Sequence, residues 1–442
     1  MSTFDFRRLC RRADAPTRRQ FVSSLARGLL GVTAAGFATR VATAARPDRR
    51  LQPLLPVHTP RGRARQVIYL FLRGGMSQID TLDPKPGQKT QGPTEALRTR
   101  ADGVLVGQHL PLLALQLDKA CIVRSMTSTQ GAHAQAQYLM RTGYEKRGTI
   151  QHPSLGAWTS MLQGRQNATL PGHVLLGGGG DMPTAGFLPP QFAALPIGDP
   201  QQGLQNARLA DGVDAARFQR RLDLLAQMDA EFGSDHPHRD VAAYGEAYAD
   251  AVRLMRSDDL TAFDIDREDD AMRDVYGRTP FGAGCLLARR LVEHGVRYCE
   301  VVSDGWDTHA DNFDRLADLL PAIDRGLAAL LADLDARGLL QETLVVLATE
   351  FGRTPDIDED QGRNHYPKVF SCLLAGGGVR GGRAYGSTDA EGREVAESPV
   401  TIPDLNATIA FALGLPLDQT VTSPSGRPFT VADKGEPIHE LF

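Results

Sequence analysis

An aspartate and a histidine two residues apart, Asp307 and His309, are the side chains best suited to metal chemistry. They lie in the turn Gly305-Trp306-Asp307-Thr308-His309, which follows an apolar run at 296–302. A carboxylate and an imidazole on one glycine-supported turn can converge on a single cation. The spacing therefore predicts part of a site for a first-row divalent metal, for which zinc is the simplest fit.

Two further polar clusters border apolar runs. Thr349 and Glu350 follow one run, with Arg353 three residues further on, and His365 leads into the next run. A lone histidine of this kind is more often a structural loop residue than a ligand, but three polar clusters at successive strand ends indicate a shared site. We therefore expect one divalent ion, with these ligands: Asp307, His309, His365 and Glu350.

The loop after the apolar run 67–72 contains a pair of glycines, in the sequence Arg73-Gly74-Gly75-Met76-Ser77-Gln78-Ile79-Asp80. Paired glycines let backbone amides approach an anion, and Asp80 could reach the same cation as the histidines. We count Asp80 among the predicted ligands and Ser77 among the predicted catalytic residues. The alternative is a plain glycine turn capped by Asp83.

His133 opens a helical pattern that ends near Gly143, after an apolar run at 120–123 and Arg124. A helix N-terminus stabilises an anion or an anionic nucleophile. We predict His133 as a catalytic residue, and Arg353, Arg124 or Arg73 as the group that binds a substrate oxyanion. In the alternative interpretation, His133 merely caps the helix.

These loops need a scaffold that brings them together. Apolar, β-branched runs of this length are typical of strands buried on both faces. They occur at Val67–Leu72, Ala120–Val123, His173–Leu176, Val296–Val302, Leu344–Ala348 and Val369–Leu374. An amphipathic helical stripe occupies 313–335, between two of them. Alternating strands and helices predict a three-layer α/β/α domain with a mostly parallel central sheet, whose carboxyl edge binds ligands.

The segment 200–275 is charged and helical, and we interpret it as a helical cap inserted into the domain. Its stretch 264–274 is strongly acidic. A calcium loop would need alternating acids and a glycine, which this stretch lacks, so a solvated acidic face is the better interpretation.

The first 45 residues differ from the rest. Thr17-Arg18-Arg19-Gln20-Phe21-Val22 resembles a twin-arginine export signal, an apolar stretch follows, and Ala42-Thr43-Ala44 suits cleavage. We predict a signal peptide at 1–45, a linker at 46–65, an α/β domain at 66–442, and a periplasmic or secreted protein that engages the twin-arginine machinery. Arg27 and Arg40 interrupt the apolar stretch, so no membrane span is expected in the mature protein. The alternative is an amphipathic N-terminal helix of a cytosolic protein.

Charge and cysteine content narrow the function further. The 442 residues carry a formal net charge of −4, and no basic block lies beyond the N-terminus, which argues against a nucleic-acid partner. Four cysteines follow the signal segment, with no CxxC unit. They are expected to be buried thiols rather than a zinc knuckle or a disulfide framework.

The polar motifs together resemble those of the DUF1501 family, which is similar to the alkaline phosphatase and sulfatase superfamily. The resemblance covers nearly all of the chain after the signal. The motifs that carry it are Gly74-Gly75-Met76-Ser77 with Asp80, Asp83-Pro84-Lys85-Pro86, Gly305-Trp306-Asp307-Thr308-His309, Thr349-Glu350-Phe351-Gly352-Arg353-Thr354-Pro355 and Asn364-His365-Tyr366-Pro367.

The resemblance implies an alkaline phosphatase/sulfatase-like fold in which Asp307, His309 and His365 form one metal site. It places Glu350 as a ligand, Phe351 where the superfamily has a second histidine, and His133 at the nucleophile position. Since phenylalanine cannot bind a metal, one site is expected rather than two. No cysteine stands where a sulfatase formylglycine would form.

These observations lead to two main hypotheses. The first is an exported metal-dependent hydrolase of phosphate or sulfate esters, whose substrate is an anionic small molecule or glycan. The second is a non-catalytic relative that binds a metal or a glycan and acts in assembly or secretion. A transferase or mutase of the same superfamily is a third possibility.

Overall fold

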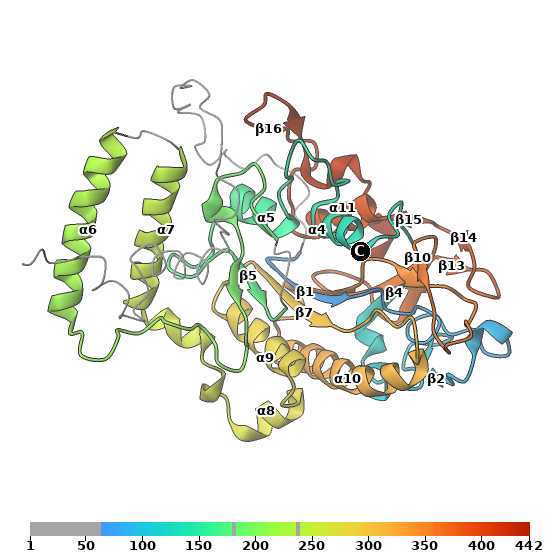
Figure 1. Ribbon diagram of the computed structural model, residues 1–442. Coiled ribbons are helices and arrows are strands. Elements are labelled where there is room, and N and C mark those ends of the chain that lie inside the picture. Colours follow the sequence, from blue (N-terminus) through green and yellow to red (C-terminus); the bar gives the residue numbers. More distant parts are fainter. Residues whose placement is uncertain (1–62, 179–182, 236–238) are drawn as a thin grey trace, which may run out of the picture.

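The computed structural model describes residues 63–178, 183–235 and 239–442, and a nine-stranded sheet forms its centre (Figure 1). The strand order is β12-β4-β11-β8-β1-β7-β5-β6, with β15 beside β4. The strands are β1 (Gln66–Arg73), β4 (Ala120–Thr127), β5 (His173–Leu176), β6 (Leu195–Ile197), β7 (Tyr298–Asp304), β8 (Thr343–Ala348), β11 (Phe370–Gly376), β12 (Arg383–Tyr385) and β15 (Val400–Thr401).

Every pairing in this sheet is parallel except the two made by β11, which runs antiparallel to β4 and to β8. Each of the six apolar runs singled out in the sequence lies within or overlaps one of these strands. The predicted α/β class with a mostly parallel sheet is therefore confirmed.

Strand β1 shows how the sheet separates two cores. Ile68, Leu70 and Leu72 pack into one core, and the alternate residues Val67 and Phe71 pack into the other. Successive side chains of a strand point to opposite faces, so full burial of the run requires a helical layer on each side.

The two helical layers are built from different parts of the chain. The first core contains buried residues of α9 (Pro280–Glu293) and α10 (Asn312–Ala336). The second contains residues of α4 (His133–Thr142), α5 (Leu155–Gln163) and α11 (Ile402–Ala412). Figure 1 shows these two sets of helices on opposite sides of the sheet.

Strand direction explains why distant loops meet. Since β11 is antiparallel to both β4 and β8, strands β1, β4, β7 and β8 all point the same way. Their carboxyl ends lie at one edge, and the amino end of β11 lies at that edge as well. A loop that leads into β11 therefore reaches the same place as loops that leave the other four strands.

The region between β6 and α9 is helical. It contains α6 (Ala215–Asp235), α7 (Arg239–Met255), α8 (Asp270–Tyr276) and two 3₁₀ segments at Asp258–Phe263 and Ile265–Arg267. Figure 1 shows α6 and α7 as a pair at the end of the molecule remote from β13 and β14. In the part of the chain that the structure describes, no helix is long and apolar enough to cross a bilayer.

Smaller elements complete the fold. They include α3 (Pro111–Ala114), several short 3₁₀ helices and four strand pairs: β2 (Ala96–Arg98) with β3 (Leu105–Gly107), β9 (Gly352–Arg353) with β10 (His365–Tyr366), β13 (Ser387–Thr388) with β14 (Val395–Glu397), and β16 (Val421–Thr422) with β17 (Pro428–Phe429). The predicted signal peptide and most of the predicted linker lie outside the described residues.

Candidate metal centre

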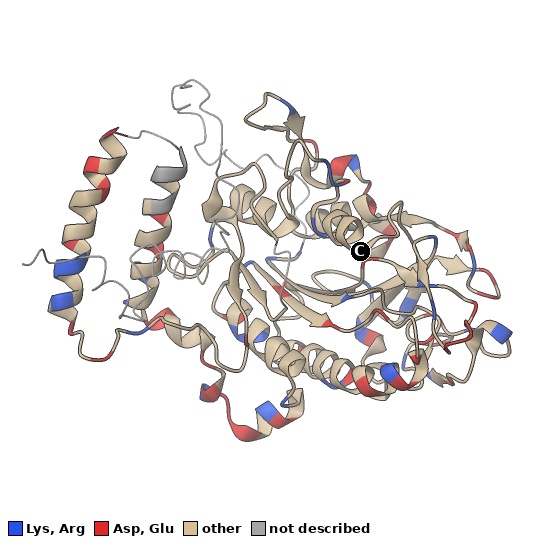
Figure 2. Cartoon of the chain, in the orientation of Figure 1, with Lys and Arg blue, Asp and Glu red and all other residues tan. Residues whose placement is uncertain are grey.

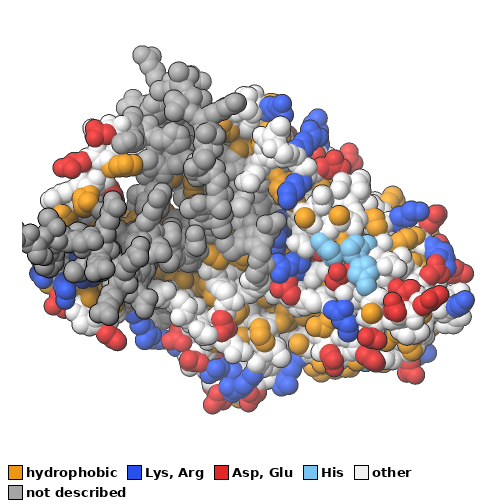
Figure 3. All heavy atoms as spheres, in the orientation of Figure 1, with side chains coloured by type: hydrophobic (Ala, Val, Ile, Leu, Met, Phe, Trp, Pro, Cys, Tyr) orange, Lys and Arg blue, Asp and Glu red, His pale blue; other side chains and the backbone are white. Residues whose placement is uncertain are grey.

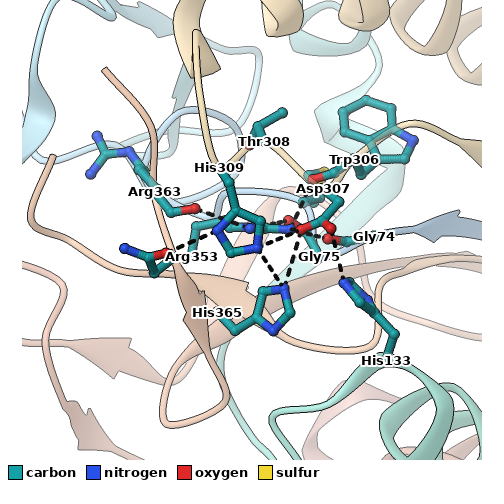
Figure 4. A network of polar contacts seen from close by, with 12 residues as sticks. Gly74, Gly75, His133, Trp306, Asp307, Thr308, His309, Arg353, Arg363 and His365 are labelled. Carbon is teal, nitrogen blue, oxygen red and sulfur yellow. Dashed lines mark hydrogen bonds and ion pairs between the residues drawn. The ribbon is translucent and has the colours of Figure 1, made fainter. Parts of the chain in front are cut away.

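Three histidines and an aspartate meet at the carboxyl edge of the sheet. His133 is the first residue of α4, Asp307 and His309 lie in the loop between β7 and α10, and His365 lies in β10. The pairing of β10 with β9 carries His365 towards the loop that follows β8. Figure 4 shows the imidazoles turned towards the Asp307 carboxylate, and Figure 3 shows histidine side chains grouped on the surface.

The ring nitrogens surround Asp307 at short range. Asp307 Oδ1 lies 3.0 Å from His309 Nε2 and 3.2 Å from His365 Nε2, and these two nitrogens are 3.0 Å apart. His133 Nε2 lies 3.3 Å from the other oxygen, Oδ2. Ligand atoms of His133, Asp307 and His365 all fall within 4.8 Å of one another. The structure thus brings together side chains that lie far apart in sequence.

In His365 and His309, the Nδ1 nitrogen, which faces away from Asp307, is bonded to a hydrogen-bond acceptor. His365 Nδ1 lies 2.9 Å from the carbonyl of Gly131, and His309 Nδ1 lies 2.9 Å from Asn364 Oδ1. A carbonyl oxygen accepts and cannot donate, so each Nδ1 must carry the proton. In the neutral imidazole, Nε2 then presents a lone pair to Asp307.

This arrangement leaves two lone pairs and a carboxylate oxygen facing one point. His309 Nε2, His365 Nε2 and Asp307 Oδ1 form a triangle with sides of 3.0, 3.0 and 3.2 Å. Ligands at the usual zinc distances would be separated by about 3.3 Å in a tetrahedron. A divalent cation would satisfy all three atoms, so the donor set fits the predicted metal and leaves a fourth position open.

Arg353 stabilises the negative charge of Asp307 from the protein interior. Its guanidinium donates to Asp307 Oδ1, to the carbonyls of Gly75 and Arg363 at 2.8 and 3.0 Å, and to that of Gly74. Burial alone would raise the pKa of Asp307, but the hydrogen bond and charge of Arg353 hold that pKa well below its ordinary value. Arg353 is wholly buried, so it acts on the site through Asp307.

Glu350 lies beneath the cluster and supports His133. Its side chain is fully buried, and Oε1 lies 2.9 Å from His133 Nδ1 and accepts hydrogen bonds from the Gly74 amide and Gln137 Nε2. The hydrogen bond with Glu350 raises the pKa of His133, against the opposing effect of burial. Glu350 was predicted as a metal ligand, but it reaches the site only through its hydrogen bond to His133. A carboxylate in this position orients the imidazole, as carboxylates that hydrogen-bond to metal-ligating histidines do.

The glycine pair after β1 is required by close packing. Gly74 has φ 131°, and a Cβ there would lie 2.5 Å from the amide nitrogen of Asp307. Gly75 has φ 86°, and its Cβ would meet the Phe351 ring at 2.6 Å. The amide of Gly74 does approach an anion, as the glycines suggested, but this anion is the internal carboxylate of Glu350.

Phe351 forms an apolar floor under two of the imidazoles. Its ring centroid lies 5.0 Å from that of His133 and 4.5 Å from that of His365, and the side chain is fully buried. Packing against Phe351 fixes the planes of both rings. It also fills the space beside the cluster with carbon atoms that cannot bind a metal.

Asp80 and Ser77 belong to a different network. Asp80 pairs with the buried guanidinium of Arg363 at 2.8 Å and accepts hydrogen bonds from Ser77 Oγ, Thr94 Oγ1 and Asn312 Nδ2. Both Asp80 and Ser77 are buried. The structure does not bring these two predicted site residues to the histidine cluster; they join the loop after β1 to the start of α10.

The other predicted arginines are also engaged. Arg124 donates to the carbonyls of Leu82 and Leu105 at 3.1 and 2.9 Å and pairs with Asp83 at 3.3 Å. Arg73 pairs with Asp304 at the end of the neighbouring strand. Arg124 is therefore turned towards the loops after β1 and at β3.

Two contacts of the site were not predicted from the sequence: the pairing of His133 with Glu350, and the support that Asn364 gives to His309. Adjacency to His365 was an available signal for Asn364, whose side-chain amide donates to Asp358 and so turns Oδ1 towards His309. The partner of His133 had no comparable signal, since Glu350 lies 217 residues away.

Residues 64–442 match the family described as "Protein of unknown function (DUF1501)". No protein of curated function matches the chain. Similar solved structures include the PsFucS1 sulfatase from Pseudoalteromonas sp., at 13% identity and TM-score 0.38, covering 80% of this chain and 68% of that one. A protein in the alkaline phosphatase superfamily from Vibrio parahaemolyticus has 9% identity and TM-score 0.39, with 85% and 70% covered. A mutant of the alkaline phosphatase PafA has 10% identity and TM-score 0.40, with 87% and 100% covered.

Proposed function

The chain belongs to the DUF1501 family, and we propose that it is a metal-dependent hydrolase of phosphate or sulfate esters. The observation that carries this proposal is the pair of imidazole nitrogens, 3.0 Å apart, that face each other across Asp307 Oδ1. Two nitrogen lone pairs beside a carboxylate repel one another unless a proton or a metal cation lies between them, and a metal cation would satisfy all three ligand atoms at once. We assign Asp307, His309 and His365 as the ligands of one divalent ion, zinc by preference.

The charge of such a centre favours an anionic substrate. A divalent cation with one carboxylate ligand has a net charge of about +1, and His133 adds positive charge when it is protonated. When bound, the ion would polarise an ester oxygen and offset the charge that develops during displacement. The substrate class that fits is an anionic phosphate or sulfate ester, either a small molecule or a glycan.

His133 is the group placed to move a proton. Its Nε2 lies on the Asp307 side of the ring, and Glu350 stabilises the protonated form through Nδ1. In hydrolysis, the bond from phosphorus or sulfur to the ester oxygen breaks and the departing oxygen needs a proton. We assign His133 to donate that proton from Nε2 and to recover it from the water that is consumed.

We also propose that the protein works in the periplasm or outside the cell. The support is the twin-arginine-like sequence Thr17–Val22 and the apolar stretch after it. Export in a folded state would suit a protein that acquires its metal before translocation.

A second function is favoured by one specific observation. Arg124 and Arg353, two of the guanidiniums predicted to bind an oxyanion, donate to backbone carbonyls instead. A metal- or glycan-binding protein without turnover, acting in assembly or secretion, would not need them. This alternative predicts bound metal and no hydrolysis.

Metal content and turnover together test the proposal. Full-length protein exported by its host is expected to hold about one divalent ion per chain and to cleave aryl phosphate or aryl sulfate esters. His365→Ala should lose the metal, whereas His133→Gln should keep it and lose about 10²–10⁴-fold in kcat. His294→Gln, at an exposed histidine at the end of α9, is the matched control and should change neither.

The outcomes separate the two functions. Wild-type protein without stoichiometric metal would remove the basis of the hydrolase proposal. Bound metal without turnover on either ester would favour the non-catalytic alternative. Metal retention in His365→Ala would show that the ligand set is wrong.

A further inference from the structure

Arg315 holds the turn that carries Asp307. The turn connects β7 to α10, and we call its residues 305–308 the metal turn. Nη2 of Arg315 donates a hydrogen bond to the carbonyl of Gly305 at 2.8 Å, and Nη1 donates to the carbonyl of Asp307 at 2.7 Å. A planar guanidinium presents its donors in a fixed geometry, so these two bonds set the spacing of the two carbonyls. Arg315 therefore contacts the backbone of the residue whose carboxylate faces the histidines.

The other two carbonyls of the metal turn also have donors, which come from the protein interior. The carbonyl of Trp306 accepts from Nη2 of Arg353 at 3.3 Å, and that of Thr308 accepts from the backbone amide of Arg363 at 3.1 Å. Arg353 and Arg363 are fully buried, whereas Arg315 is half-buried. Arg353 and Arg363 form ion pairs as well, so Arg315 is the residue whose replacement tests the turn most directly.

The metal turn begins with a glycine that has wide conformational freedom. Gly305 has φ 101° and is exposed, and glycine adopts a positive φ of this kind at little steric cost. Glycine also loses more conformational entropy than any other residue when it becomes ordered. If the turn were free to move, metal binding would have to order it, and the affinity would fall accordingly. Hydrogen bonds that fix the turn in advance remove this cost.

Arg315 joins the metal turn to a rigid element. It is the fourth residue of α10, and its amide donates to the carbonyl of Asp311 at 3.0 Å as part of the first helical turn. The helix has 25 residues, and its Leu316 and Leu320 pack into the first core. A side chain anchored on such a helix keeps its position, so the turn to which it bonds is held relative to the core.

The charge of Arg315 is unusual for its place in the helix. The N-terminal end of a helix favours anions and disfavours cations. The other charged residues at 311–320 follow this preference, since they are the acids Asp311, Asp314 and Asp318. Figure 2 shows acidic and basic residues together at the end of α10 that joins the metal turn. The two hydrogen bonds to the metal turn account for a cation at this position.

We infer that Arg315 is a positioning residue of the candidate metal centre, which fixes the Asp307 carboxylate by holding the metal turn on α10. The inference deepens the proposed function and rests on its metal site, but it does not require hydrolysis. Arg315 acts through the backbone of Asp307. Its positive charge would repel a divalent cation bound nearby. Charge alone therefore predicts tighter metal binding when Arg315 is removed, whereas positioning predicts weaker binding.

Zinc affinity tests the inference, because the two explanations predict opposite signs. Full-length protein is stripped of metal and titrated with Zn²⁺ in competition with a chelating dye. Arg315→Met should weaken Zn²⁺ binding about tenfold, as the loss of other groups that orient metal ligands does. Arg315→Lys keeps hydrogen-bond donors but loses the planar fork, so its affinity should lie between those of Arg315→Met and wild type. If Arg315→Met does not fold, weaker Zn²⁺ binding by Arg315→Lys than by wild type gives the same test.

Arg325 provides the matched control. It is exposed on the same helix and also donates to two backbone carbonyls, but these belong to Asp274 and Val275 of α8. Arg325→Met should lower the thermal midpoint of the metal-free protein about as much as Arg315→Met does, and it should leave Zn²⁺ affinity unchanged. Loss of affinity in Arg315→Met alone would therefore report the position of Asp307 and not a general loss of helix contacts.

The outcomes separate this inference from the proposed function. If Arg315→Met binds Zn²⁺ as tightly as wild type or more tightly, the inference is overturned and the metal centre stays in place. Equal weakening in Arg325→Met would also overturn the inference. Wild-type protein that binds no Zn²⁺ would overturn the metal centre and the inference together. Zinc binding without turnover, with the expected order of affinities, would support the inference and contradict only the hydrolase assignment.

Discussion

Two aspartates in this protein were predicted to bind one metal, and the structure gives them opposite surroundings. Asp80 is buried and pairs with the guanidinium of Arg363, with three further hydrogen-bond donors around it. Asp307 has 44% of its side chain exposed and faces histidine nitrogens. One carboxylate is satisfied by cations and donors of the protein itself. The other is surrounded by additional metal-ligand atoms.

The comparison shows how a fold separates a structural carboxylate from a candidate ligand. A buried acid needs a fixed cation and donors for its lone pairs, and Asp80 has both. Around Asp307, Arg353 supplies one cation, and the Nε2 atoms of His309 and His365 lie at the same oxygen, where each can act as a metal ligand. Asp307 is therefore surrounded by more potential metal ligands than Asp80, and this difference distinguishes the candidate metal centre from the structural carboxylate.

The largest effect on stability is expected where the buried Asp80 carboxylate pairs with Arg363. Arg363→Met would leave the Asp80 carboxylate buried without its cation, and the free energy of unfolding should fall by about 3–5 kcal/mol. Urea denaturation at pH 7 measures this change. Arg393→Met, which breaks an exposed pair with Asp356, is the control and should have little effect. A similar stability for Arg363→Met and wild type would show that Asp80 does not depend on Arg363.

His152, a buried histidine outside the cluster, contrasts with His133, because its pKa is lowered whereas that of His133 is raised. His152 Nδ1 lies 2.8 Å from the Tyr138 hydroxyl, and burial, with the charge of Arg147, lowers the pKa of His152 to about 4. The unfolded chain binds a proton near pH 6.5, whereas the folded protein does so only near pH 4. This stabilisation is therefore complete above pH 6.5, and about 3 kcal/mol is lost as the pH falls from 6.5 to 4.

The variant His152→Gln isolates that contribution. Urea midpoints measured between pH 4 and 7.5 should fall less steeply with decreasing pH in the variant than in wild type, because one proton-binding difference has been removed. The comparison is between the two slopes, since other groups titrate in both proteins. Parallel curves would mean that His152 titrates alike in the folded and unfolded chains.

The smallest effect is expected at Asn364, which holds the exposed candidate ligand His309 in place. Asn364 Oδ1 accepts the hydrogen bond from Nδ1 of His309. Hydrogen bonds of this kind, which orient a metal-ligating histidine, typically contribute 10–100-fold to metal affinity. Asn364→Ala should weaken divalent-metal binding about tenfold, which corresponds to about 1.4 kcal/mol, as measured by competition with a chelating dye. Asn364→Asp keeps an acceptor and should bind at least as tightly as wild type. Equal affinities in all three proteins would remove Asn364 from the site.

Much of the scaffold follows from local pattern. The alternation of buried residues in 67–72 matches the two cores on either side of β1, and the apolar stripe at 313–335 matches α10 within one residue at each end. Such patterns depend on backbone periodicity, which neighbouring residues set. The same reasoning selected the turns after β7 and β8 and before β11, where Asp307, His309, Glu350 and His365 lie.

Long-range placement decided which polar groups meet. Asp80 and Arg363 are 283 residues apart, and their pairing turned a predicted ligand into part of a closed network. The same packing buried Arg353 under Asp307 and set Glu350 behind His133. Residue type states what a side chain can bind, whereas its actual partner depends on which strand ends and loops the sheet order brings into contact. That order arises from burial of the whole core, which no local segment encodes.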